Sequence, residues 1–115
     1  MYDLEDRTLK LAISVRIFVK ILPKTISNIE DAKQLIRSSG SVGANYNEAN
    51  EALSRKDFLL RVKISRKEAK ETLYWLNIIL VSNDLDSEVE TKCRSLIKET
   101  GEIRNILSAI LKKSS

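Results

Sequence analysis

The chain has 115 residues, enough for one hydrophobic core but not two, so we expect a single domain over residues 1–115. Apolar residues make up 43% and charged residues 31%, with three glycines and one proline. This composition excludes a disordered chain and a many-stranded β protein. The net charge of +4 permits a polyanionic partner without requiring one.

The residue types that most often carry enzyme chemistry are scarce. The chain has no histidine and one cysteine, Cys93, so an activated nucleophile is not expected and no intrachain disulfide can form. We therefore expect no catalytic residues, no metal and no cofactor. The charged N-terminus does not resemble a targeting peptide, and no apolar run approaches the roughly 20 residues that span a bilayer, so a cytoplasmic protein without membrane contact is expected.

The first expected helix covers about residues 6–22 and ends before Pro23. Apolar residues cover most of its circumference, since Leu9 and Ile13 mark one stripe and Leu11 and Val15 another. This distribution predicts a helix that is contacted on more than one side.

A second helix is expected over about residues 28–53, with Asn28 as its N-cap. Its middle is unusual because Ser38 to Ala44 are small, apart from Val42, and two glycines in a helix cost about 1 kcal/mol each relative to alanine. Either the helix breaks there, or small side chains let another helix approach closely. The periodic pattern resumes in phase after Gly43, which favours the second interpretation.

Two more helices follow, over about residues 54–81 and 87–113. Ser54 and Asp57 resemble a capping box, and Ser87 with Glu90 forms the standard one. The last helix has a coiled-coil-like stripe from Val89 to Ile110, in steps of four and three. Four amphipathic helices with short connections predict an all-α, antiparallel up-down four-helix bundle.

The third helix carries the most concentrated charge in the chain. At about 100° per residue, one arc roughly 120° wide holds only basic charges. These six residues are Arg55, Lys56, Lys63, Arg66, Lys67 and Lys70. The arc is either a phosphate-contacting surface for nucleic acid or a solvated face that keeps the protein soluble. Only Tyr74 is interleaved with it, so stacking on single-stranded bases is weakly supported.

Two carboxylates of the same helix, Glu68 and Glu71, share a side with Trp75, so at least one should be partly buried and need a partner. The candidate partners on the second helix are Arg37, Ser41 and Asn45. A structural polar network is the favoured interpretation. A metal or acid–base site using Glu48, Glu68 and Glu71 is the alternative, although di-metal bundles also use histidine, which this chain lacks.

Two segments also resemble a known family: RSSGSVGANYNEANEALSRKDF, residues 37–58, and KEAKETLYWL, residues 67–76. They are similar to bacterial four-helix-bundle proteins first named for open reading frames within intervening sequences of 23S ribosomal RNA genes. Leu-Pro-Lys at positions 22–24 also fits, so the resemblance covers essentially the whole chain. Two departures are Ser65, where the family usually has a small apolar residue, and Tyr46, where an aliphatic residue is commoner.

The resemblance implies a homo-oligomer, typically a pentamer in which bundles pack side by side into a barrel. A relative is the accessory variability determinant protein of diversity-generating retroelements, a basic pentamer that binds nucleic acid and a reverse transcriptase. The resemblance therefore favours a non-enzymatic, self-assembling protein that binds nucleic acid, RNA or RNA/DNA, through the basic arc. The alternative is a protein-interaction scaffold without a nucleic-acid ligand, whose partner would be a protein such as a reverse transcriptase.

Overall fold

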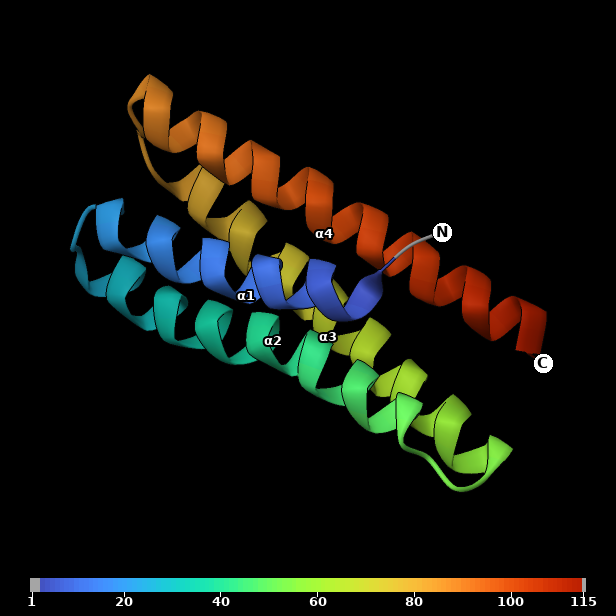
Figure 1. Ribbon diagram of the computed structural model, residues 1–115. Coiled ribbons are helices and arrows are strands. Elements are labelled where there is room, and N and C mark those ends of the chain that lie inside the picture. Colours follow the sequence, from blue (N-terminus) through green and yellow to red (C-terminus); the bar gives the residue numbers. More distant parts are fainter. Residues whose placement is uncertain (1–2, 115) are drawn as a thin grey trace.

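The computed structural model describes residues 3–114 and confirms the predicted all-α four-helix bundle (Figure 1). Its helices are α1 (Leu4–Ile21), α2 (Ile26–Asn50), α3 (Arg55–Ser82) and α4 (Ser87–Ser114). They form a ring in which α1 contacts α2 and α4, and α3 contacts the same two helices. Over the described residues, Cα atoms of the diagonal pairs α1/α3 and α2/α4 do not come within 8 Å of each other.

Each helix contributes an apolar stripe to the core. In α4 the predicted stripe is buried from Val89 through Leu107, because steps of four and three keep these residues on one face. The prediction that the stripe ends at Ile110 is wrong, since Ile110 is only partly buried and Leu111 takes the core position. The step from Leu107 to Leu111 is four residues, which places Leu111 on the same face of α4 as Leu107.

Polar side chains cap the helices, but two of the predicted caps are wrong. Ser54 caps α3 as predicted, accepting from the Asp57 amide at 3.0 Å. Helix α2 begins earlier than expected because Thr25, not Asn28, caps it. At α4, Asp86 accepts from the Val89 amide at 3.0 Å, so the predicted Ser87–Glu90 capping box is not formed. Glu90 instead pairs with Arg94, one turn along.

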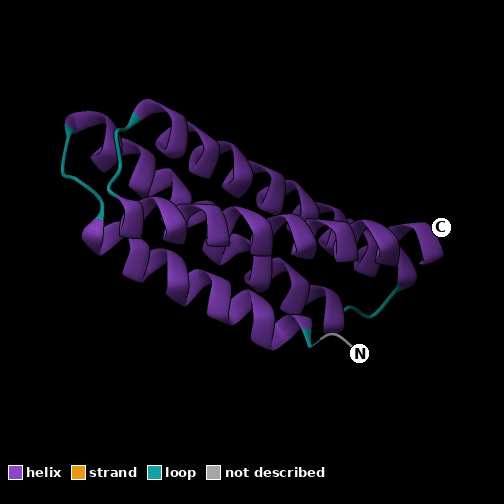
Figure 2. Cartoon of the chain, turned by 90° about the horizontal axis from the view of Figure 1, so that it is seen from above, coloured by secondary structure: helices purple, strands orange, loops and turns teal. Residues whose placement is uncertain are grey.

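Asn28 has a different role from the predicted one. Its buried amide exchanges two hydrogen bonds with the amide of Asn83, at 2.8 and 2.9 Å, and donates to the carbonyl of Pro23. These bonds join the α1–α2 loop to the end of α3, at the end of the bundle where two loops lie together (Figure 2). The Asn28–Asn83 pair fixes the position of the α1–α2 hairpin along the bundle axis relative to the α3–α4 hairpin.

The small residues in α2 permit close helix approach, as the sequence predicted, because α2 is unbroken through both glycines. A Cβ atom added at Gly43 would lie 2.7 Å from Oγ1 of Thr8 on α1, too close for any side chain without a shift. A Cβ atom at Gly40 would meet only the end of Arg16, at 3.7 Å. Only Gly43 is therefore required by contacts within the chain.

Helices α1 and α4 are joined by Arg7, whose guanidinium contacts the carboxylate of Glu99 through two nitrogens, at 2.6 and 2.9 Å. A third contact, to Glu102, measures 3.1 Å. Hydrogen bonding to Glu99 is the main reason that the pKa of Arg7 is raised above its ordinary value. This ion pair leaves no local pattern in the sequence, because Arg7 and Glu99 are 92 residues apart.

Candidate nucleic-acid interface

The six basic residues predicted on the third helix lie along the side of α3 that turns away from the core. We call them the basic stripe. Five are exposed to solvent, and Arg66 is half-buried. The buried residues of α3, from Val62 to Ile79, occupy the opposite arc, because the helix repeats every 3.6 residues. The stripe therefore faces solvent along the first half of α3.

None of the stripe residues forms an ion pair in the part of the chain that the structure describes. The basic partners of the ion pairs found there lie on the other three helices: Arg7 and Lys10 on α1, Lys33 and Arg37 on α2, and Lys92 and Arg94 on α4. Acidic neighbours thus compensate much of the basic charge elsewhere, while the charge of α3 is left for solvent or a ligand.

Arg66 connects the stripe to α4, because its Nη1 atom lies 3.5 Å from Oγ of Ser108. Arg104 and Lys112 stand four residues before and after Ser108, and residues four apart share one face of a helix. The positive surface therefore extends from α3 towards the C-terminal half of α4. This extension could not be predicted from the sequence, because it depends on how α3 and α4 are aligned.

The aromatic residue at the end of the stripe, Tyr74, is exposed and makes an edge-to-face contact with Trp75 at 5.0 Å between ring centroids. Its ring is available to a base, but no further aromatic residue follows on the basic stripe. This arrangement suits contact with a phosphate backbone better than stacking along a single strand.

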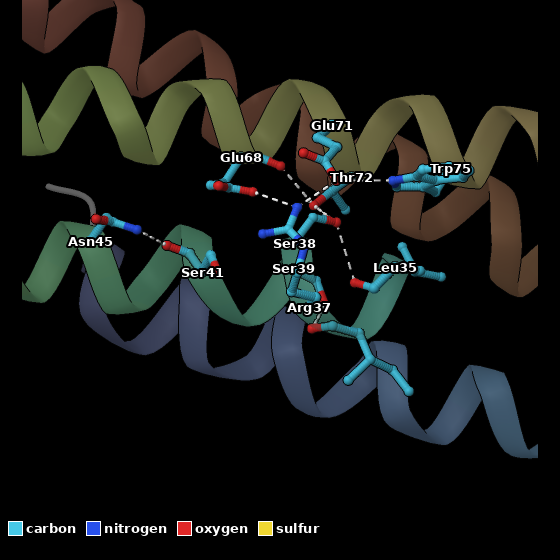
Figure 3. A network of polar contacts seen from close by, with 11 residues as sticks. Leu35, Arg37, Ser38, Ser39, Ser41, Asn45, Glu68, Glu71, Thr72 and Trp75 are labelled. Carbon is cyan, nitrogen blue, oxygen red and sulfur yellow. Dashed lines mark hydrogen bonds and ion pairs between the residues drawn. The ribbon is translucent and has the colours of Figure 1, made fainter. Parts of the chain in front are cut away.

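On another side of α3, the structure brings Glu68 and Glu71 together with Arg37 of α2 (Figure 3). The Arg37 guanidinium donates to both carboxylates, reaching Glu68 at 3.2 Å, and Glu71 also accepts from the indole of Trp75 at 3.1 Å. Glu68 is only 8% exposed. Hydrogen bonding to Arg37, with a smaller contribution from Trp75, lowers the pKa of Glu71 below its ordinary value.

The other two predicted members of this network lie elsewhere. Asn45 donates to the Ser41 carbonyl at 2.9 Å, and Figure 3 shows both residues further along α2 than Arg37. The Asn45 oxygen accepts from Arg61 at 3.4 Å, a partner that the sequence analysis did not identify. In the described part of the chain, neither Ser41 nor Asn45 forms a hydrogen bond with either carboxylate. The predicted network is therefore split into two separate links between α2 and α3, one through Arg37 and one through Asn45.

In addition to these two links, buried hydroxyl groups join α2 to α3. Ser65 is fully buried and donates to the Val42 carbonyl at 2.7 Å, which accounts for a hydroxyl where the family usually has an apolar residue. The hydroxyls of Thr72 and Ser38 lie 3.0 Å apart. Tyr46, the other departure, is half-buried and packs against the core. These contacts make α2 and α3 a tightly matched pair.

Cys93 and Glu48, two residues of types that take part in enzyme or metal chemistry, lie in different surroundings. Cys93 is buried in the core, and burial raises the pKa of its thiol to about 11, which keeps it protonated at neutral pH. Within residues 3–114, no three histidine, cysteine, aspartate or glutamate side chains gather into a group that could hold a metal ion. Glu48, proposed with Glu68 and Glu71 in the metal alternative, is exposed. None of the described helices is both long and apolar enough to span a membrane.

Comparison with known proteins gives a consistent result. The family model of the 23S rRNA-intervening sequence protein matches residues 3–109. A crystal structure of a protein of unknown function from the S23 ribosomal protein family of Bacteroides thetaiotaomicron VPI-5482 is similar, with 32% identity and a TM-score of 0.80. The match covers 94% of this chain and 97% of that one. No curated protein matches the chain. The chain therefore belongs to the 23S rRNA-intervening sequence protein family.

Proposed function

We propose that this protein is a non-enzymatic homo-oligomer of the cytoplasm that binds nucleic acid, RNA or RNA/DNA, through the basic stripe on α3. The assembly expected from the family resemblance is a pentamer. The observation that supports nucleic-acid binding most strongly is the unpaired state of the stripe. Its six positive groups have no ion-pair partner within residues 3–114, whereas six basic groups on the other three helices, two on each, are paired.

The chemistry of the stripe favours the phosphate backbone over the bases. Lysine and arginine side chains spaced along one helix face neutralise phosphates and release the counterions bound to them. Such contacts position a nucleic acid without reading its sequence, which requires contacts to base edges. We expect binding that depends on the shape and charge of the nucleic acid more than on its sequence.

Self-assembly would multiply a modest affinity. One copy offers a single stripe, and a second stripe held in the same assembly converts the next contact into an intramolecular event. Avidity of this kind raises overall binding by about 10²–10⁴-fold without any new type of contact. An oligomer can therefore bind a long RNA tightly even though each copy contributes few contacts.

The test compares two triple variants for binding to a fluorescently labelled RNA hairpin. The first reverses the stripe with Lys63→Glu, Arg66→Glu and Lys67→Glu. The control reverses Lys92, Arg94 and Lys98, exposed residues in the N-terminal half of α4, and makes the same change in net charge. We expect the stripe variant to lose binding while the control retains it within about threefold. Circular dichroism should show equal helix content in both.

If the stripe variant binds RNA as the wild type does, the stripe is a solvated face and this function is wrong. Equal loss in both variants would mean that net charge, rather than this surface, drives binding. A wild-type protein that does not bind the RNA hairpin would instead favour the alternative, a scaffold for a protein partner such as a reverse transcriptase. A co-purification with that partner that survives nuclease treatment would identify this alternative.

A further inference from the structure

Helix α1 has a second apolar face that the bundle leaves uncovered. Leu9, Ile13 and Ile17 are 58%, 48% and 52% exposed. They are spaced four residues apart and so form one continuous ridge along the helix. The buried residues Leu11 and Val15 lie two positions from Ile13, about 200° around the helix. We call Leu9, Ile13 and Ile17 the outer ridge, since they point away from the core.

A single exposed apolar side chain needs no explanation, but a row of them on one helix does. Other strongly exposed apolar residues, such as Leu53 and Val81, stand singly at helix ends. The outer ridge instead runs through the middle of α1, and Ile21 continues it at 39% exposure. Such a ridge is typical of a helix that packs on a second surface.

The neighbouring helix offers a matching surface. Gly40 and Ala44 are four residues apart on the outward side of α2, and Ala44 is exposed. We call these two residues the small-residue patch. A glycine inside a helix costs about 1 kcal/mol relative to alanine, yet a Cβ atom at Gly40 would make only an ordinary contact with Arg16. Nothing within the chain requires this glycine, unlike Gly43.

The ridge and the patch lie at similar heights in the bundle. Gly43 of α2 touches Thr8 of α1, and the two helices run in opposite directions. At 1.5 Å per residue, Leu9 and Ile13 are therefore within about one helical turn of the levels of Ala44 and Gly40. In a ring whose axis runs along the bundles, neighbouring copies keep the same height, so the ridge of one copy faces the patch of the next.

Charge favours a contact between α1 and α2 of different copies. Helix α1 carries four basic and two acidic side chains, whereas α2 with its C-cap Glu51 carries four acidic and two basic ones. Pairing two copies of α1 would instead bring like charges together. Because α1 and α2 occupy adjacent corners of the bundle, each contact turns the next copy in the same sense. Repeated contacts between unlike faces close into a ring when the rotation from one copy to the next divides a full turn evenly.

We infer that the outer ridge of α1 packs on the small-residue patch of α2 in a second copy of this chain. The inference rests on the self-assembly in the proposed function and names the surfaces that make it. Helices α3 and α4 then lie away from the contact, so the basic stripe and its extension onto α4 stay accessible to nucleic acid. Assembly and nucleic-acid binding use different corners of the same bundle.

The first test measures mass by sedimentation equilibrium for the wild type and three variants. Ile13→Glu places a charge on the ridge, and Gly40→Leu fills the patch with a side chain whose Cβ atom would meet only the end of Arg16, at 3.7 Å. Val81→Glu is the control, because Val81 is 82% exposed but lies at the far end of α3. We expect the first two variants to be monomers with wild-type helix content, and Val81→Glu to keep the wild-type mass.

A cross-linking test identifies the neighbour directly. In a protein carrying Ile13→Cys and Gly40→Cys, mild oxidation should link copies through disulfides into covalent multimers, whereas Ile13→Cys alone should give none. The native Cys93 does not interfere, because it is buried and its pKa is raised to about 11. Covalent dimers from Ile13→Cys alone would overturn the inference in favour of an α1-to-α1 contact.

The outcomes separate this inference from the proposed function. A wild-type protein that stays monomeric at high concentration would remove both the interface and the self-assembly. An oligomeric wild type with unchanged mass in Ile13→Glu and Gly40→Leu would overturn the interface alone. The monomeric variants should bind RNA more weakly because avidity is lost, while the salt dependence of binding per copy stays the same. This result would support both the interface and the proposed function.

Discussion

The outward faces of α1 and α3 differ in nearly every respect that determines what a protein surface binds. The two helices stand at diagonal corners of the bundle, and both bury one face in the core. Outside, α1 presents the aliphatic outer ridge, whereas α3 presents six basic groups without an ion-pair partner in residues 3–114. The difference indicates that one corner suits contact with an apolar protein surface and the other contact with a polyanion.

The largest expected difference between the two faces is in how salt concentration affects what each one binds. If about five stripe residues contact phosphates, RNA affinity should fall roughly 100-fold or more between about 50 and 200 mM salt. The apolar contact made by the outer ridge does not weaken in that range, so the free protein should stay assembled while RNA binding is lost. Fluorescence anisotropy and sedimentation over the same salt series provide the comparison. A parallel loss of RNA binding and of assembly would show that both surfaces are electrostatic.

The two glycines of α2 give a matched pair of predictions. Gly43→Ala should destabilise the bundle by about 1–3 kcal/mol, because the added Cβ atom would lie 2.7 Å from Thr8 Oγ1. Gly40→Ala should instead stabilise it by about 0.5–1 kcal/mol, the helix-propensity gain at an unobstructed site. Urea denaturation in the Ile13→Glu background, where copies are separated, measures both. Equal effects would contradict the distinction between an inner and an outer glycine.

The Arg37 link to Glu68 and Glu71 helps to hold α3 against α2. Its removal should have a moderate effect on the stability of the bundle. Arg37→Ala leaves the buried Glu68 without its cation, but Arg37 is half-exposed, so water replaces part of the loss. We expect destabilisation of about 1–2 kcal/mol. Lys33→Ala, which breaks only an exposed pair, should change stability by less than about 0.5 kcal/mol. If Arg37→Ala lowers stability no more than Lys33→Ala does, the Arg37 link contributes no more than an ordinary ion pair on the surface.

The smallest expected effect is on acid stability. The pKa of Glu71 is lowered in the folded protein by Arg37, so its contribution to stability is present above the ordinary pKa of 4.5 and is lost as pH falls through the lowered value. Glu71→Gln should therefore flatten the dependence of unfolding free energy on pH below about 4.5, without changing its slope near neutral pH. Denaturation midpoints measured across this range test the sign.

The sequence predicts those parts of the fold that depend on residues close together along the chain. The spacing of Val89, Cys93 and Leu96 sets the buried face of α4 by helical geometry alone. The small residues around Gly43 similarly indicate close approach of a helix, although not which one. Predictions fail where a distant residue decides. Asn28 looks like a helix cap until Asn83, far along the chain, becomes its partner.

The candidate site follows the same rule. The basic stripe is a property of one helix, so periodicity is sufficient to place it on one face. Arg66 is the exception, because its partial burial depends on Ser108 of α4. The sequence predicts that Arg37 pairs with the two carboxylates. It does not predict the contact of Asn45 with Arg61, because that contact depends on how α2 is aligned along α3. Such alignments depend on side chains from every helix together.

The mass of the protein in solution, measured by sedimentation with and without an RNA hairpin, tests the central claim most directly. We predict a closed oligomer, five copies if the family resemblance holds, that becomes heavier by the mass of bound RNA at low salt. Its stripe variant with Lys63→Glu, Arg66→Glu and Lys67→Glu should assemble equally well but stay at the mass of protein alone. A monomer, or an oligomer whose mass is the same with and without RNA, would contradict the account.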